Sequence, residues 1–197
     1  MEIREALAVI FDLDGTLVRL PIDYMALREE LKRLASKYGV CSEFRPIIGE
    51  VSRLAELLAE GAKFVQECTA VIDYYEDKAA EIVEPVRGAK DCLSLLKSKG
   101  KKIGVVSNNS TPSVKKALRN AELLEYVDAY IGREGLKVKP DPYPVVKVID
   151  SLNIKRENVI MIGNSELDFM AAERVKIRAY VFKGGDLCAF VQSIENL

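Results

Sequence analysis

Short apolar runs rich in Val and Ile alternate along most of the chain with segments whose apolar residues recur at helical spacing. Each run is bounded by Gly, Asn or Asp, as buried β-strands commonly are. The pattern predicts strands over residues 7–13, 102–107, 127–131, 159–162 and 179–182, and helices over residues 90–99, 112–121, 142–152 and 167–175. Because strands and helices alternate, the sequence predicts an α/β fold in which helices cover both faces of a parallel sheet.

Residues 23–83 break this alternation, because they contain no strand-like run but carry apolar residues at helical spacing. One stripe comprises Tyr24, Leu27, Leu31, Leu34 and Tyr38, a second comprises Val65, Cys68, Ile72, Tyr75, Ala79 and Ile82, and Val51, Leu54 and Leu58 lie between them. The sequence therefore predicts an all-helical subdomain inserted after the first strand. Proline and glycine at both connections place this subdomain at residues 21–84 and the α/β core at residues 1–20 and 85–197.

Charge balance narrows the class of partner. The 197-residue chain has 29 basic and 30 acidic residues, so its net charge favours neither nucleic acid nor a membrane surface, and a small molecule is expected. No run approaches the roughly 18 apolar residues of a membrane span, which favours a cytoplasmic location. The sequence leaves the oligomeric state open.

The absence of histidine narrows the chemistry. Without it, Ser-His-Asp catalysis, Cys-His catalysis and imidazole zinc sites are excluded. The four cysteines form no C-x-x-C pair, so they give no signal for a zinc site or a redox pair. Any reaction must therefore depend on carboxylates, lysines, hydroxyls and metal ions.

The most informative motif is Asp12-Leu13-Asp14-Gly15-Thr16, at the end of the first predicted strand. Ligands in open α/β sheets bind beyond the carboxyl ends of the strands, so both acids lie where a site is expected. Alternation along a strand would point them to opposite faces. They can share a site only if the chain leaves β geometry, and Gly15 permits such a turn. Taken alone, the motif is equally compatible with a turn that carries a capping Asp.

Three further loops carry polar groups: Ser107-Asn108 after the second long strand, Lys139-Pro140 before a helix, and residues 163–168 after the fourth. Each has an ordinary explanation, namely helix capping, a solvated surface lysine, and acidic residues at a helix start. Together, however, they would place a hydroxyl, an ammonium and a further carboxylate around the first two acids.

In this combination the chain resembles the haloacid dehalogenase-like superfamily, and within it the phosphatases with a helical cap, such as phosphoglycolate phosphatase. The motifs D-x-D-G-T, Ser-Asn, Lys-Pro and Gly-x-Ser-x-x-Asp occur in the family's order and span the whole chain. The resemblance implies a Mg²⁺-dependent phosphatase that acts on a small phosphorylated metabolite, with the inserted helices as the cap.

The resemblance also implies a role for each motif. Asp12 would attack phosphorus to form an aspartyl-phosphate, and Asp14 would act as general acid and then as general base. Lys139 would offset the negative charge of the nucleophile and the phosphate. The expected phosphate-binding residues are Thr16, Ser107 and Asn108, and the expected Mg²⁺ ligands are Asp12, Asp14, Asn164 and Asp168.

Position 164 departs from the family pattern, which usually has Asp after the glycine. The amide oxygen of Asn164 can still coordinate Mg²⁺, but the site loses one negative charge and should bind the metal less tightly. Glu166 or Asp168 could supply the missing charge instead, and the sequence leaves these alternatives open.

Other functions also stay open on sequence alone. A phosphomutase would pass the phosphoryl group from Asp12 to a sugar, and a 2-haloacid dehalogenase would use the same nucleophile without a metal, although Asp14 argues against it. A phospho-ligand-binding protein with a degraded site is favoured only by Asn164, and a receiver-like signalling protein fits the order of the acids less well. Phosphoglycolate, a sugar phosphate and a nucleoside monophosphate are all compatible substrates.

Overall fold

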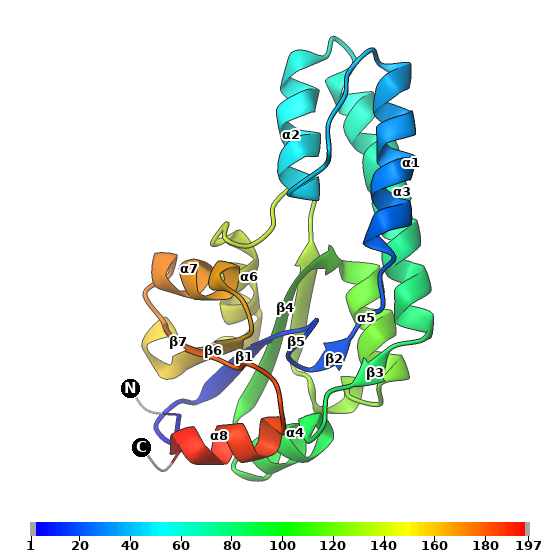
Figure 1. Cartoon of the computed structure of the whole chain (residues 1–197). Helices are drawn as coiled ribbons and strands as arrows, with labels where there is room; N and C mark the ends of the chain where they lie inside the picture. Colours follow the sequence, from blue (N-terminus) through cyan, green and yellow to red (C-terminus); the bar gives the residue numbers. More distant parts are fainter. Residues whose placement is uncertain (1–2, 196–197) are drawn as a thin grey trace.

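The computed structural model describes residues 3–195 and contains a five-stranded sheet in the order β5-β4-β1-β6-β7, with every pairing parallel (Figure 1). Its strands are β1 (Ala8–Asp12), β4 (Lys102–Ser110), β5 (Ala129–Arg133), β6 (Val159–Gly163) and β7 (Arg178–Val181). The predicted α/β class is confirmed, and each predicted strand overlaps an observed one. The central position belongs to β1, whose carboxyl end is therefore flanked by the ends of β4 and β6.

Strand β4 continues three residues beyond its predicted end. Its register with β5 shifts between Val106 and Ser110, where Ser110 pairs with Arg133. Ser107 and Asn108 thus lie inside an irregular stretch of strand, and the prediction that the strand ends before Asn108 is wrong. Such an irregularity interrupts the alternation of side chains and re-aims them, which a pattern of apolar residues does not reveal.

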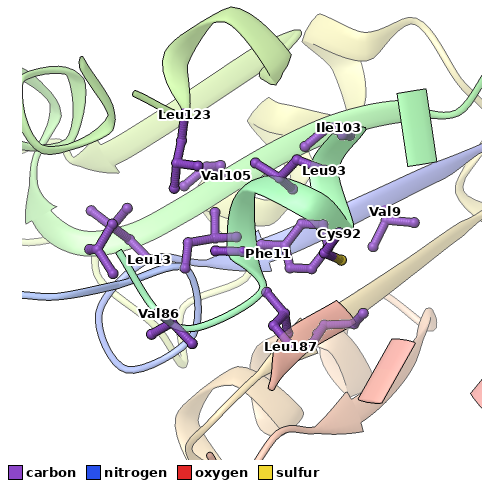
Figure 2. Packing of buried hydrophobic residues seen from close by; sticks show 14 of the residues in the cluster. Val9, Phe11, Leu13, Val86, Cys92, Leu93, Ile103, Val105, Leu123 and Leu187 are labelled. Atoms are coloured by element: carbon purple, nitrogen blue, oxygen red, sulfur yellow. The ribbon is translucent and has the colours of Figure 1, made fainter. Parts of the chain in front are cut away.

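Helices cover both faces of the sheet. Helices α4 (Ala89–Ser98), α5 (Thr111–Asn120) and α8 (Leu187–Glu195) pack on one face, while α6 (Tyr143–Leu152) and α7 (Glu166–Arg174) pack on the other. Short 3-10 turns, η1 (Leu124–Tyr126) and η2 (Arg156–Asn158), precede β5 and β6. Side chains alternate along β1, so Val9 and Phe11 belong to the core under α4, α5 and α8, while Ala8 and Ile10 belong to the core under α6 and α7. Figure 2 shows Val9 and Phe11 in the first of these cores.

The inserted segment forms α1 (Tyr24–Lys37), α2 (Ile47–Leu57) and α3 (Gly61–Glu81), which rise above the carboxyl edge of the sheet (Figure 1). These helices enclose a hydrophobic core of their own, and the prediction that the segment is helical is confirmed. The predicted stripe on α3 is partly wrong, because Ile82 is 68% exposed and Glu76 is buried on the inward face. Within residues 3–195, no helix combines the length and the apolarity needed to cross a bilayer.

Both connections to this segment run through a small antiparallel ribbon. Strand β2 (Val18–Arg19) leads out of the core and pairs with β3 (Glu84–Pro85), which leads back. The ribbon is anchored by a backbone hydrogen bond of 2.9 Å from Val86 N to Leu17 O. Two-residue strands are too short to show a period, so the sequence did not predict them.

A buried ion pair joins α3 to the sheet. The Arg133 guanidinium donates to both carboxylate oxygens of Glu76 at 2.9 Å and to Asp73 at 2.8 Å, and the Ser110 N–H donates to Glu76 at 2.7 Å. The side chains of Arg133 and Glu76 are only 3% and 6% exposed. Burial raises the pKa of Glu76, while the Arg133 charge and the Ser110 hydrogen bond oppose the rise. The helical segment is therefore held against the sheet by a buried ion pair, in which the charges of Arg133 and Glu76 compensate each other.

We expect Arg133→Met to lower the free energy of unfolding by about 3 kcal/mol, because it leaves the Glu76 carboxylate buried without its counter-ion. Urea denaturation measures the change. Adding Glu76→Gln should restore part of the loss, since no unpaired charge then stays buried. Lys90→Met, which breaks an exposed pair with Glu122, is the matched control and should shift the midpoint little. Equal shifts for the two single variants would contradict this account.

Candidate active site

Asp12 is the last residue of β1 and is only 6% exposed. Immediately after it the chain turns, and the Leu13 carbonyl accepts hydrogen bonds from the backbone N–H groups of Thr16, Leu17 and Val18. The departure from β geometry that the sequence required therefore occurs. The Thr16 hydroxyl donates to Asp12 Oδ2 at 3.3 Å, so the predicted phosphate-binding threonine also holds the predicted nucleophile.

The turn requires glycine at position 15 for two reasons. Gly15 has a φ of +80°, a left-handed conformation that side chains with a Cβ rarely adopt. A Cβ on Gly15 would also lie 2.0 Å from Asn164 Nδ2. That amide donates to the Asp14 carbonyl at 3.2 Å, so the loop after β6 lies directly against the turn after β1. The Asp14 carboxylate itself accepts from Leu20 N at 2.9 Å.

Lys139 is the centre of the site. It is 4% exposed, and its ammonium donates a short hydrogen bond to Asp12 Oδ1, a second of 2.6 Å to Asp168 Oδ1 and a third of 3.3 Å to the Val106 carbonyl. The explanation of this residue as a solvated surface lysine is therefore wrong. One ammonium joins β1, β4, α7 and the loop after β5, and the predicted nucleophile is one of its partners.

Asn108 fixes the loop that carries Lys139. Its side-chain oxygen accepts from Lys139 N at 2.8 Å, and its side-chain nitrogen donates to the Lys139 carbonyl at 3.3 Å. Ser107 beside it is 2% exposed, and its hydroxyl accepts from Asn109 N at 3.2 Å. The sequence did not predict this use of the Asn108 side chain, because its partner lies 31 residues further along the chain.

Asp168 is the third residue of α7 and is 2% exposed. Its Oδ2 accepts from the backbone N–H and the hydroxyl of Ser165 at 3.0 and 2.6 Å, and from Asn164 N at 3.2 Å. Ser165 was not among the predicted site residues, although the spacing Ser-x-x-Asp is the signature of such a capping box. Lys139 binds the other oxygen, so both oxygens of Asp168 have hydrogen-bond partners.

Burial and charge set the protonation of these groups. Burial raises the pKa of Asp12 to about 6, with a further rise from Asp168 and an opposing effect of Lys139. Burial also raises the pKa of Asp14, against backbone hydrogen bonds. Burial alone would lower the pKa of Lys139, but the carboxylates of Asp12 and Asp168 outweigh it and the pKa lies above its usual range. An ionised Asp12 and a protonated Lys139 therefore coexist at neutral pH.

The donor chemistry of the site fits Mg²⁺. Within residues 3–195, no three acidic, cysteine or histidine side chains are arranged as a ready metal cluster. The oxygens nearby are Asp12 Oδ2, the Asp14 carbonyl and the side-chain oxygen of Asn164, whose amide nitrogen donates to that carbonyl. Mg²⁺ takes oxygen ligands, commonly one or two carboxylates completed by water. When Asp12, Asp14 and Asp168 are all ionised, they and the Lys139 ammonium leave two negative charges in excess, which one divalent cation would balance.

Comparison with known proteins gives matches over most of the chain. Residues 9–182 match the family described as haloacid dehalogenase-like hydrolase. The chain is 32% identical to a phosphoglycolate phosphatase of Aquifex aeolicus over 84% of its length and 79% of the relative's, and 25% identical to the pyrophosphatase PpaX of Bacillus cereus over 84% and 77%. The structure of CbbY from Rhodobacter sphaeroides in complex with phosphate shares the fold, with a TM-score of 0.64, 20% identity and coverage of 91% and 87%.

We expect Gly15→Ala to lower the free energy of unfolding more than Gly39→Ala does. Both glycines have left-handed φ angles, which alone cost a residue with a Cβ about 1–2 kcal/mol. A Cβ at Gly39 meets nothing within 4 Å, whereas one at Gly15 collides with Asn164. Chemical denaturation of both variants measures the difference, which should shrink when Asn164 is also replaced by Ala. Equal losses for the two glycine variants would contradict the close approach.

Proposed function

The chain belongs to the haloacid dehalogenase-like hydrolases, and we propose that it hydrolyses small phosphomonoesters with Asp12 as the nucleophile. The observation that carries this proposal is the buried Lys139 ammonium, which binds Asp12 at the end of the central strand. A lysine held there stabilises the ionised nucleophile and attracts the phosphate dianion to it. The phosphate-related names of the two curated relatives support the same reaction class.

In the first half-reaction, an Asp12 oxygen forms a bond to phosphorus as the bond from phosphorus to the alcohol oxygen breaks. Asp14 gives its proton to that oxygen, and the alcohol leaves. Thr16, Ser107 and Asn108 are the proposed phosphate-binding residues, and the contact of Thr16 with Asp12 supports its assignment. The aspartyl-phosphate on Asp12 divides one difficult displacement into two easier steps.

In the second half-reaction, Asp14 takes a proton from water as the water oxygen attacks phosphorus and the bond to Asp12 breaks. The raised pKa of Asp14 suits a group that must first hold and then regain a proton. Mg²⁺, when bound, would neutralise the phosphoryl charge. Its proposed ligands are Asp12, the Asp14 carbonyl and Asn164, with Asp168 as an orienting group.

Two alternatives within the enzyme classes differ in how the reaction ends. A phosphomutase would return the phosphoryl group to a second sugar hydroxyl instead of water, and phosphate release discriminates the two. A dehalogenase would not need the acid at position 14.

We further propose residues 21–84 as the cap over the site and residues 1–20 with 85–197 as its core, since the helices stand at the carboxyl edge of the sheet (Figure 1).

Wild-type protein should release phosphate from an aryl phosphate with Mg²⁺ but not with a chelator. Asp12→Asn should abolish this release, because an amide cannot form the aspartyl-phosphate. Asp141→Asn, in the Lys139 loop but outside the site, is the control and should keep the activity. Release by Asp12→Asn at the wild-type rate would contradict the proposed nucleophile.

Asn164→Asp should lower the Mg²⁺ concentration needed for half-maximal activity, by about tenfold if it behaves like other changes in metal surroundings. The new carboxylate adds a charge, and without metal it would face the Asp14 carbonyl to which Asn164 now donates. The same variant should therefore gain more thermal stability from Mg²⁺ than wild type does. An unchanged or higher Mg²⁺ requirement would contradict the assignment of Asn164 as a ligand.

A further inference from the structure

The irregular stretch of β4, residues 106–110, carries Ser107 and Asn108, two of the proposed phosphate-binding residues. Four steps along β4 here match only two steps along β5, from Ile131 to Arg133. Extra residues in one strand leave backbone groups outside the regular ladder, and buried backbone groups need other partners. The conformation that presents the phosphate-binding residues must therefore be held by contacts from outside the ladder.

Two side chains from other elements hold this stretch. Arg133 Nε donates to the Asn108 carbonyl at 3.3 Å, and the Ser110 N–H donates to a Glu76 oxygen at 2.7 Å. Arg133 and Glu76 also bind each other at 2.9 Å, so each fixes the orientation of the other. Hydrogen bonds with an ionised partner are stronger than those between neutral groups. The pair therefore holds the backbone of β4 at two points, one from β5 and one from α3.

Asn108 connects this stretch to Lys139. Its side-chain oxygen accepts from Lys139 N at 2.8 Å, and its side-chain nitrogen donates to the Lys139 carbonyl at 3.3 Å. The Lys139 ammonium in turn binds Asp12. A shift of the Asn108 backbone would move the side chain that fixes the lysine, and a displacement of about 1 Å can lower a reaction rate about 100-fold. Arg133 is therefore linked through Asn108 to the residue that binds the proposed nucleophile.

Other contacts attach α3 to the core at the surface. Lys116 of α5 binds Asp77 at 2.8 Å, and the Asn120 side chain donates to the Ala80 carbonyl at 2.9 Å. The Lys116 and Asp77 side chains are 29% and 49% exposed, so these contacts require little desolvation. A buried ion pair is by comparison a weak source of stability. The backbone that the buried pair fixes explains its position better than attachment of the helix does.

We propose that Glu76 and Arg133 are positioning residues for the phosphate site. They fix the backbone of residues 108–110, which keeps Asn108, and through it Lys139, in the arrangement that binds phosphate. The proposal rests on the proposed phosphatase function and deepens it, because one helix of the inserted segment then determines the shape of the phosphate site itself.

Arg133→Lys tests the contact with β4, because lysine keeps a positive charge beside Glu76 but has no donor at the position of Nε. We expect this variant to bind inorganic phosphate about tenfold more weakly than wild type in the presence of Mg²⁺, measured by calorimetry. With an aryl phosphate, kcat should also fall, since Lys139 is displaced. Asp73→Asn is the matched control, because Asp73 binds Arg133 at 2.8 Å from the same helix and is half exposed. It should change phosphate affinity by less than about twofold.

Two variants of Glu76 separate its hydrogen bond from its charge. Glu76→Gln keeps an oxygen that can accept from the Ser110 N–H, whereas Glu76→Leu has none. We expect the Gln variant to bind phosphate within about threefold of wild type and the Leu variant about tenfold more weakly. Equal losses in the two variants would show that only the charge matters and would overturn the positioning of β4. Lys116→Met, which weakens the surface attachment of α3, should leave phosphate affinity unchanged.

The remaining outcomes separate positioning from stability. A pair that serves only stability would lower the urea midpoint of Arg133→Lys and leave the phosphate affinity of the folded variant at the wild-type value, which would overturn the proposal. A loss of affinity in Lys116→Met equal to that in Arg133→Lys would also overturn it, because the site would then respond to any loosening of α3. Arg133→Lys and Asp73→Asn decide the matter even if Glu76→Leu does not fold.

The same measurements distinguish this proposal from the proposed reaction, because inorganic phosphate binds without turnover. Wild-type protein that releases no phosphate from the aryl phosphate, while the variants bind inorganic phosphate in the expected order, would refute the reaction and leave the positioning role intact. Phosphate release that is lost in Asp12→Asn but unchanged in Arg133→Lys and Glu76→Leu would support the reaction and overturn the positioning role.

Discussion

The ammonium of Lys139, buried between two carboxylates, constrains both the core and the site. A charge removed from water is tolerated only with good compensation, and here the compensation comes from the ends of β1 and α7. The loop after β5 must therefore reach the middle of the sheet, and Asn108 holds it there. The arrangement of the acids and the stability of the core therefore depend on one electrostatic requirement, because the acids cannot separate without leaving the lysine unpaired.

The same edge of the sheet carries a second buried ion pair, between Glu76 and Arg133, which positions the helical segment. The two pairs are linked along β4, because Asn108 contacts Lys139 through its side chain and accepts from Arg133 through its backbone carbonyl. Whatever binds beside Asn108 is therefore surrounded by fixed charges that already have partners. Such a setting is preorganised, because these charges keep their partners without rearrangement.

The parts of this protein that the sequence predicted are those with a local signal. Apolar runs located the sheet, and helical spacing located the inserted helices. The burial of Lys139 and Glu76 had no such signal, because Lys139 pairs with an acid 127 residues away and Glu76 with an arginine 57 residues away. The strand irregularity at Ser107 and the two-residue strands were also missed, since each depends on a neighbouring strand rather than on its own residues. The motif pattern named the acids, and their contacts came only from the structure.

The ribbon of β2 and β3 makes the core largely independent of the size of the inserted helical segment. Because Val18 pairs with Pro85, the two ends of the inserted segment lie side by side where it leaves the core. Closing a loop costs free energy that grows only slowly with its length, so the stability of the core depends little on the length of the segment inserted between β2 and β3. The α/β part of the fold can therefore accept a longer or shorter helical insertion at this ribbon with little change in its own stability.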